Sequence, residues 1–181
     1  MAYKFLESKI SVSTDNAIHV AKNIKLQDLE NPELRLESCG NLASKLAESG
    51  RIREELIFFQ RDFPKKKVGA VLDGRDIGSV IFPKAKIKLF VIADLEVRAK
   101  RRQVDYKKMG QEYSLRDLTE KLKERDKRDK NRKVSPLICM PDAIVFDNSE
   151  ISYERLNKEI IEIVEKKYKS LNLNTNIKKK S

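Results

Sequence analysis

The sequence predicts an α/β fold with a parallel β-sheet. Three short apolar runs, at residues 68–72, 87–92 and 143–147, have the length and composition of buried strands. Helical patterns separate the second run from the third, and this alternation is typical of parallel sheets. The 181 residues fit one domain, and a hydrophobic content of 40% supports a core. Ligands of such folds bind at the carboxyl ends of the strands.

The N-terminal third is predicted to be mainly helical. Residues 1–27 mix helix formers with a polar turn, and residues 28–40 form a polar, acidic excursion. An Asn-Pro pair inside that excursion is a turn signal, and we predict a small hairpin at residues 33–38 after it. Apolar residues at helical spacing then indicate two amphipathic helices that are broken at Gly50.

Signals for helix starts and stops divide the remainder of the chain. Asp94 is suited to cap a helix that Gly110 ends. A second helix runs from about Leu115 and stops before Pro136, and a third follows the last predicted strand. The lysine-rich tail, residues 171–181, is predicted to be disordered.

Charge points to an anionic partner. The formal net charge is +11, and residues 98–133 contain fifteen Lys or Arg against seven Asp or Glu, a net +8. Such concentration favours a nucleic acid or a phosphorylated small molecule as partner. Two cysteines without a CxxC pattern and a single histidine argue against a zinc site, so no metal-ligating residues are predicted.

Compartment signals indicate a cytoplasmic protein. A cysteine-poor chain of this size fits a reducing cytosol. Residues 1–7 lack the apolar core of a signal peptide, and the longest apolar runs are about five residues, too short to span a bilayer.

The densest cluster of arginines lies on one predicted helix. At about 100° per residue, Arg125, Arg128, Asp129 and Arg132 fall within an arc of roughly 100°. Planar guanidiniums on one face suit a nucleotide's phosphates. By itself, the segment is equally typical of a solvated charged helix.

A polar turn follows the first predicted strand. Gly74 allows backbone conformations that a Cβ would block, so Arg75 and Asp76 can face a crevice as a donor beside an acceptor. A simple ion pair within the loop is the alternative. Together with the arginine helix, this turn favours a nucleotide site.

Four segments resemble the bacterial cytidylate kinases. These are DGRDIGSVIFP at 73–83, IKLF followed by RAKRR at 87–102, KERDKRDKNR with SPL at 123–137, and PDAIVFDNS at 141–149. The similarity is collinear from about Gly40 to Lys167. In combination the motifs are specific, although each is only suggestive alone.

The resemblance implies transfer of the γ-phosphoryl group of ATP to CMP or dCMP, with Mg²⁺. It assigns Arg53 to the CMP phosphate, and Arg75 with Asp76 to the cytosine ring. Arg125 and Arg128 correspond to lid arginines that close over the transferring phosphoryl group and are the predicted catalytic residues. The implied CMP-binding residues are Ser44, Arg53, Arg75, Asp76, Asp129 and Arg132. Arg101 is a further candidate, for ATP.

The same resemblance implies a domain plan. Residues 1–170 form one kinase domain, with nucleoside monophosphate-binding helices and a short insert at about 1–66 and a lid at about 110–135. The phosphate cradle of such kinases, G-x-x-x-x-G-K-[ST], does not occur in the sequence. The alignment implies that the first two strands and the cradle, or P-loop, are absent from a truncated, incomplete sheet. We therefore predict poor stability and impaired kinase activity.

Two alternatives to an active kinase remain open. One is a catalytically inactive remnant that binds CMP. The other is a basic RNA-binding protein, which the interleaved acidic residues and the lack of an aromatic stacking platform disfavour. The predicted partners are CMP, dCMP and ATP, with no membrane, and the complete chain is expected to be a monomer.

Overall fold

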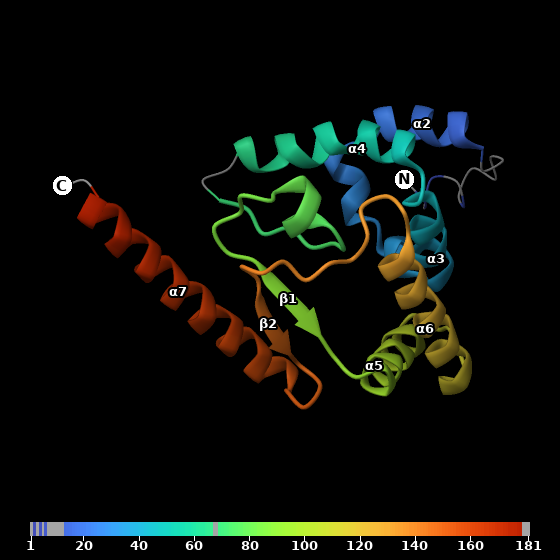
Figure 1. The fold of residues 1–181 in the computed structure, drawn as a ribbon. Coiled ribbons are helices and arrows are strands. Elements are labelled where there is room, and N and C mark those ends of the chain that lie inside the picture. Colours follow the sequence, from blue (N-terminus) through green and yellow to red (C-terminus); the bar gives the residue numbers. More distant parts are fainter. Residues whose placement is uncertain (1, 3, 5, 7–12, 67–68, 179–181) are drawn as a thin grey trace.

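A computed structural model describes residues 2, 4, 6, 13–66 and 69–178 (Figure 1). At its centre, strand β1 (Leu89–Ile92) pairs in parallel with strand β2 (Ile144–Asp147), and Leu89 lies opposite Ile144. Two of the three predicted strands and their parallel direction are therefore confirmed. The strands end side by side, which directs the segments that follow them to the same edge of the sheet.

Two helices connect the strands. Helix α5 (Leu95–Lys108) begins after Asp94 and helix α6 (Leu115–Asn131) after the side-chain cap Ser114. Gly110 lies between them with a φ of 72°, a conformation that favours glycine. The two helices pack through a small apolar cluster, formed by Ala99, Tyr106 and Leu118. The predicted helices and the stop at Gly110 are confirmed.

A second core lies among the N-terminal helices α2 (Thr14–Lys22), α3 (Glu37–Leu46) and α4 (Gly50–Asp62). Helices α2 and α4 pack side by side at the top of Figure 1. The predicted break is confirmed, because α4 begins at Gly50. Buried side chains fill the space between these helices, namely Ala2, Ala17, Val20, Cys39, Leu46 and Ile52.

The predicted hairpin at 33–38 is wrong. Two 3₁₀ helices, η1 (Leu26–Glu30) and η2 (Pro32–Arg35), occupy the excursion, and α3 begins immediately afterwards. The Asn31 side chain accepts a hydrogen bond of 2.8 Å from the Glu33 amide and so caps η2. Proline at the first helical position is preorganised for a helix, and this favours η2 over a hairpin.

The predicted strand at 68–72 is also wrong where it is described. Residues 69–73 have no regular structure, and Val71 is 97% exposed; Val68 lies outside the described residues. A strand needs a neighbour for its backbone hydrogen bonds, and within the described chain β1 pairs with β2 only. The segment instead joins the short helices η3 (Phe63–Lys66) and η4 (Ile77–Ile81).

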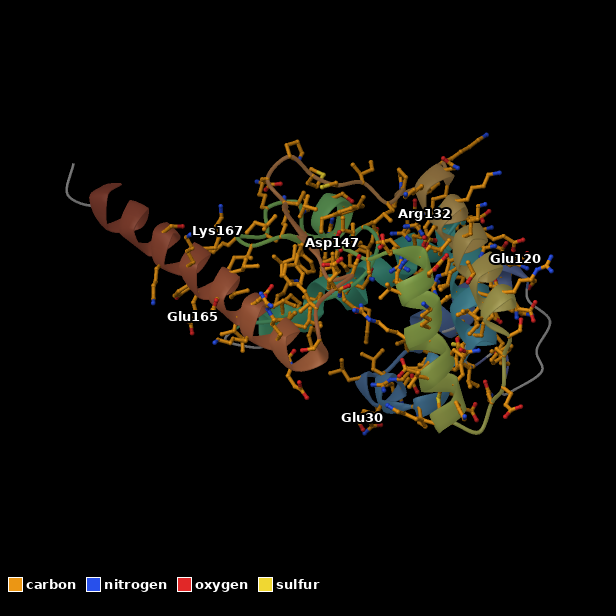
Figure 2. The ribbon with its side chains drawn as sticks, turned by 90° about the horizontal axis from the view of Figure 1, so that it is seen from below. Glu30, Glu120, Arg132, Asp147, Glu165 and Lys167 are labelled. Carbon is orange, nitrogen blue, oxygen red and sulfur yellow. The ribbon has the colours of Figure 1, made fainter. Side chains whose placement is uncertain are left out.

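Helix α7 (Tyr153–Lys178) ends the described chain. Its printed bounds extend over residues 171–178, where the sequence predicts a disordered tail, and each residue added to an established helix brings one further hydrogen bond. Figures 1 and 2 place α7, which carries Glu165 and Lys167, on the opposite side of the sheet from α6. Among the described residues no helix is both long and apolar enough to cross a membrane.

Candidate nucleotide site

Helix α6 presents two different faces. Leu118, near its start, is buried against α5, whereas the arginine-rich second half faces α3 and the turn at residues 74–76. Glu120 and Arg132 mark the two halves in Figure 2. Arg132 is the residue that caps the C-terminus of α6. The charged arc that the sequence pattern predicts therefore lies where α3 and the turn at residues 74–76 meet α6.

Asp129 is the centre of the first charge cluster. Its side chain is 2% exposed and accepts hydrogen bonds from Ser44 Oγ at 2.8 Å and Arg75 Nε at 2.9 Å. Arg125 Nε and Arg132 Nη1 lie 3.8 and 4.0 Å from its carboxylate oxygens. A buried carboxylate is costly unless it is paired and hydrogen-bonded, and this one is both.

Asp76 forms the second cluster. It pairs with Arg53 from α4, and its Oδ1 lies 3.8 Å from Arg132 Nη2. Arg132 Nε also donates to the Ser135 carbonyl at 2.7 Å, so this guanidinium joins the end of α6 to both carboxylates. Gly74, with a φ of 154°, gives the chain its path into this turn.

The arginines of these clusters have unused hydrogen-bonding capacity. Arg53 Nε, Arg125 Nε and Arg132 Nη2 are buried without an acceptor among the described residues. Burial lowers the pKa of Arg125 and of Arg132, and a neighbouring guanidinium lowers each further: Arg75 in the first case and Arg53 in the second. Asp129 and Asp76 oppose these shifts. Buried donors among like charges favour an anionic ligand that offers acceptor oxygens.

Gly40 makes room for one of these arginines. A Cβ at this position would lie 3.0 Å from Arg125 Nη1, so a larger residue would press on the guanidinium. A cavity of about 20 Å³ lies beside it, between α3, α5 and α6. Such a volume holds roughly one water molecule.

The structure brings together seven of the nine predicted site residues in the two linked clusters: Ser44, Arg53, Arg75, Asp76, Arg125, Asp129 and Arg132. Arg128 borders the clusters, because it faces α3 and its Nε donates to Ser44 Oγ at 2.9 Å. Arg101 donates to Asn148 Oδ1 at 3.0 Å and to the Asn148 carbonyl at 2.7 Å, at the end of β2.

Sequence reasoning missed two polar partners of the site. Asn41 Oδ1 accepts a hydrogen bond of 2.8 Å from Arg128, and Asp126 forms a two-pronged ion pair with Arg98 between α6 and α5. Asn41 precedes Ser44 by three residues on α3 and therefore shares its face, a spacing that could have identified it. The described residues contain no group of three or more His, Cys, Asp or Glu side chains that could hold a metal.

The parallel strands, their connecting helices and the linked Arg–Asp clusters define an α/β protein with a concentration of guanidiniums beside its sheet. The family model described as "Cytidylate kinase" matches residues 3–166. The chain therefore belongs to the cytidylate kinase family. The family is one of nucleoside monophosphate kinases, which are phosphotransferases.

Relatives named Cytidylate kinase are similar over most of the chain. One from Cereibacter sphaeroides is 38% identical over 165 residues, which span 91% of this chain and 80% of the relative. Another, from Bradyrhizobium diazoefficiens, is 40% identical over 167 residues, with 91% and 78% covered. A third, from Methylococcus capsulatus, is 44% identical over 129 residues, with 71% and 58% covered.

Proposed function

We propose that this protein phosphorylates CMP or dCMP with ATP, and that the two linked clusters hold the pyrimidine nucleotide. One observation carries the proposal. Four guanidiniums, those of Arg53, Arg75, Arg125 and Arg132, surround only two carboxylates, which leaves a local charge of +2. A phosphate monoester carries about −1.5 to −2 at neutral pH, so the phosphate of CMP balances the excess.

The mixed polarity of the site suits a cytidine nucleotide. Cytosine has an amino group that donates and a ring edge that accepts, which matches Asp76 beside Arg75 and Arg132. Ser44 and Asp129 would bind the ribose side, and Arg53 the phosphate. The buried, unpaired nitrogens of Arg53 and Arg132 fit this assignment, because a bound nucleotide supplies their missing acceptors.

Arg125 is proposed to act on the transferring phosphoryl group. Phosphoryl transfer needs alignment and positive charge around the equatorial oxygens more than covalent help from the protein. Arg125 meets this need, because its charge is held beside Asp129 and its buried Nε, 3.8 Å from that carboxylate, makes no hydrogen bond among the described residues. The roles of Arg128 at the transferring phosphoryl group and of Arg101 in ATP binding stay predictions. Mg²⁺ enters as part of the MgATP substrate, since the ion is held mainly by phosphates and water in such reactions.

Calorimetry and a turnover assay test the proposal together. The 181-residue protein is titrated with CMP, dCMP and UMP, and formation of CDP from ATP is measured in parallel. We expect CMP to bind more tightly than UMP, since Asp76 accepts from the cytosine amino group. Binding without turnover would favour the inactive remnant. Absence of CMP binding would refute the proposed site, and tight, salt-sensitive RNA binding would favour the third function.

A substitution locates the binding. Arg75→Lys keeps the charge and removes the planar fork, so we expect CMP affinity to fall about tenfold or more with ATP affinity nearly unchanged. Arg116→Lys is the matched control on α6, because that side chain is 87% exposed and pairs with Glu120 at the surface. Equal losses for CMP and ATP would contradict the assignment of Arg75.

A further inference from the structure

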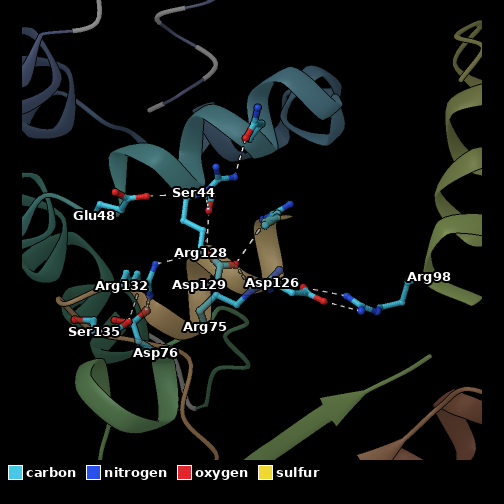
Figure 3. Close-up of polar contacts among 12 residues, drawn as sticks. Ser44, Glu48, Arg75, Asp76, Arg98, Asp126, Arg128, Asp129, Arg132 and Ser135 are labelled. Atoms are coloured by element: carbon cyan, nitrogen blue, oxygen red, sulfur yellow. Dashed lines mark hydrogen bonds and ion pairs between the residues drawn. The ribbon is translucent and has the colours of Figure 1, made fainter. Parts of the chain in front are cut away.

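One chain of hydrogen bonds links the middle of α3 to the charge cluster of α6 (Figure 3). Arg128 Nη2 donates to Asn41 Oδ1 at 2.8 Å, and Arg128 Nε donates to Ser44 Oγ at 2.9 Å. Ser44 Oγ in turn donates to Asp129 Oδ1 at 2.8 Å. The four residues form a continuous chain of hydrogen bonds, here called the relay, in which Asn41 is the end that lies farthest from Asp129.

The chemistry of the groups fixes the direction of every bond in this relay. A guanidinium only donates, so Arg128 must face the amide oxygen of Asn41 and a lone pair of Ser44. A carboxylate only accepts, so the hydroxyl proton of Ser44 must point to Asp129. Arg128 therefore prevents Ser44 from turning its proton toward α3. Ser44 therefore keeps its proton on Asp129 and retains one lone pair as an acceptor.

We propose that Asn41 is a positioning residue for CMP binding, which acts through Arg128 on Ser44 and Asp129. The inference rests on the proposed function, in which Ser44 and Asp129 bind the nucleotide. When Arg128 is held on α3, the hydroxyl proton of Ser44 stays on Asp129 and fixes the direction of that carboxylate before CMP arrives. Asp129 follows Arg128 in α6, so the hydrogen bonds of Arg128 to α3 also fix the position of Asp129 relative to α3.

Burial makes Asn41 hard to replace as the partner of Arg128. The bond between Arg128 and Asn41 is partly buried, and the Arg128 side chain is 21% exposed, so water has limited access to it. Glu48 is the other acidic neighbour, but its oxygen lies 4.0 Å from Arg128 Nε and its side chain is 51% exposed. A distant, solvated carboxylate cannot set the plane of a guanidinium as a hydrogen-bonded amide does.

The relay gives Arg128 a role that differs from the predicted catalytic one. A catalytic arginine that contacts only the phosphoryl group would lower turnover when it is removed and leave CMP affinity unchanged. A relay residue would lower CMP affinity, because Ser44 and Asp129 then lose their fixed directions. The side chain of Asn41 is hydrogen-bonded to Arg128, and it also lines the small cavity beside Arg125, so the test must separate an effect through Arg128 from a change in packing.

Three variants test the proposal. Asn41→Ala removes the acceptor, Asn41→Asp keeps an acceptor of the same shape, and Ser38→Ala is a control on the exposed face of α3. We expect Asn41→Ala to weaken CMP binding about tenfold in calorimetry, the effect of one charge-assisted hydrogen bond. Asn41→Asp and Ser38→Ala should bind CMP within about twofold of the wild type.

A double variant separates the relay from a general packing effect. If Asn41 acts through Arg128, the variant Asn41→Ala/Arg128→Ala should bind CMP as weakly as Arg128→Ala alone. Full additivity of the two losses would overturn the proposal. So would wild-type affinity in Asn41→Ala, or equal losses in Asn41→Ala and Asn41→Asp.

Hydrogen exchange provides a readout that does not depend on the nucleotide. In the protein without ligands, Asn41→Ala should speed amide exchange across residues 115–131, whereas Ser38→Ala should not. If the wild type binds no CMP, the proposed function fails and the positioning role fails with it. In that case hydrogen exchange still tests whether Asn41 stabilises the contact between α3 and α6. Unchanged amide exchange in Asn41→Ala would show that it does not.

Discussion

Replacing the buried carboxylate of Asp129 by an amide should destabilise the protein strongly. Asp129→Asn keeps the shape of the side chain but removes the negative charge beside Arg125 and leaves Arg132 with Asp76 alone. Removal of one partner of a buried ion pair costs about 3–5 kcal/mol. We expect the lower end, about 3 kcal/mol, because the side chain of Arg75 is 41% exposed and recovers hydration.

Urea unfolding followed by circular dichroism measures this loss. With a slope of about 2 kcal/mol per molar urea, a loss of about 3 kcal/mol lowers the midpoint by roughly 1.5 M. Glu120→Gln is the control on the same helix, since it pairs with an arginine that is 87% exposed, and we expect a loss of no more than about 0.5 kcal/mol. Equal midpoints for the two variants would refute the reasoning that burial makes the Asp129 cluster strong.

Three further predictions concern other parts of the molecule. Gly74→Ala should lower the free energy of unfolding by about 1–3 kcal/mol, because its φ is 154° and a Cβ would lie 2.9 Å from a side chain of η4; an unchanged urea midpoint would contradict this. The Lys88 amine donates to Asp142 and lowers the pKa of that carboxyl below 3.8. Stability from a lowered carboxyl pKa is present above pH 3.8 and lost as pH falls, so the stability difference between wild type and Lys88→Met should shrink below pH 3.8 in acid titrations; a constant difference would exclude this linkage. A thiol reagent should modify the exposed Cys139 quickly and the buried Cys39 only on unfolding, and two fast thiols in the native protein would show that α3 opens readily.

Helical periodicity predicted the part of the site that lies on α6. The spacing of Arg125, Asp129 and Arg132 places them on one face whatever the remainder of the fold does, and the structure confirms that face. The direction of Arg128 could not be predicted in the same way. It depends on the acceptor Asn41, which lies 87 positions earlier in the chain, and a periodic pattern contains no information on contacts at that separation.

Strand prediction failed where it depended on a partner. The apolar run at 68–72 has the composition of a strand, but composition does not supply the neighbouring backbone that its amides and carbonyls need. The runs that contain β1 and β2 succeeded, since each finds the other along four pairs of residues. The hairpin at 33–38 failed for a local reason, because Asn31 caps a helical turn there.

Two carboxylates among four guanidiniums give the proposed site both order and selectivity. Asp76 and Asp129 hold the long arginine side chains in place before a ligand binds, which avoids an ordering cost of about 0.5–1.5 kcal/mol for each side chain that would otherwise be mobile. A site of arginines alone would attract any phosphate and discriminate poorly among them. Carboxylates only accept hydrogen bonds, so they favour a ligand that brings donors as well as phosphate oxygens. A cytidine nucleotide brings both, through its amino group and ribose hydroxyls. In the proposed site, the two carboxylates would therefore weaken the attraction for inorganic phosphate and favour a nucleotide, whose donors they can accept.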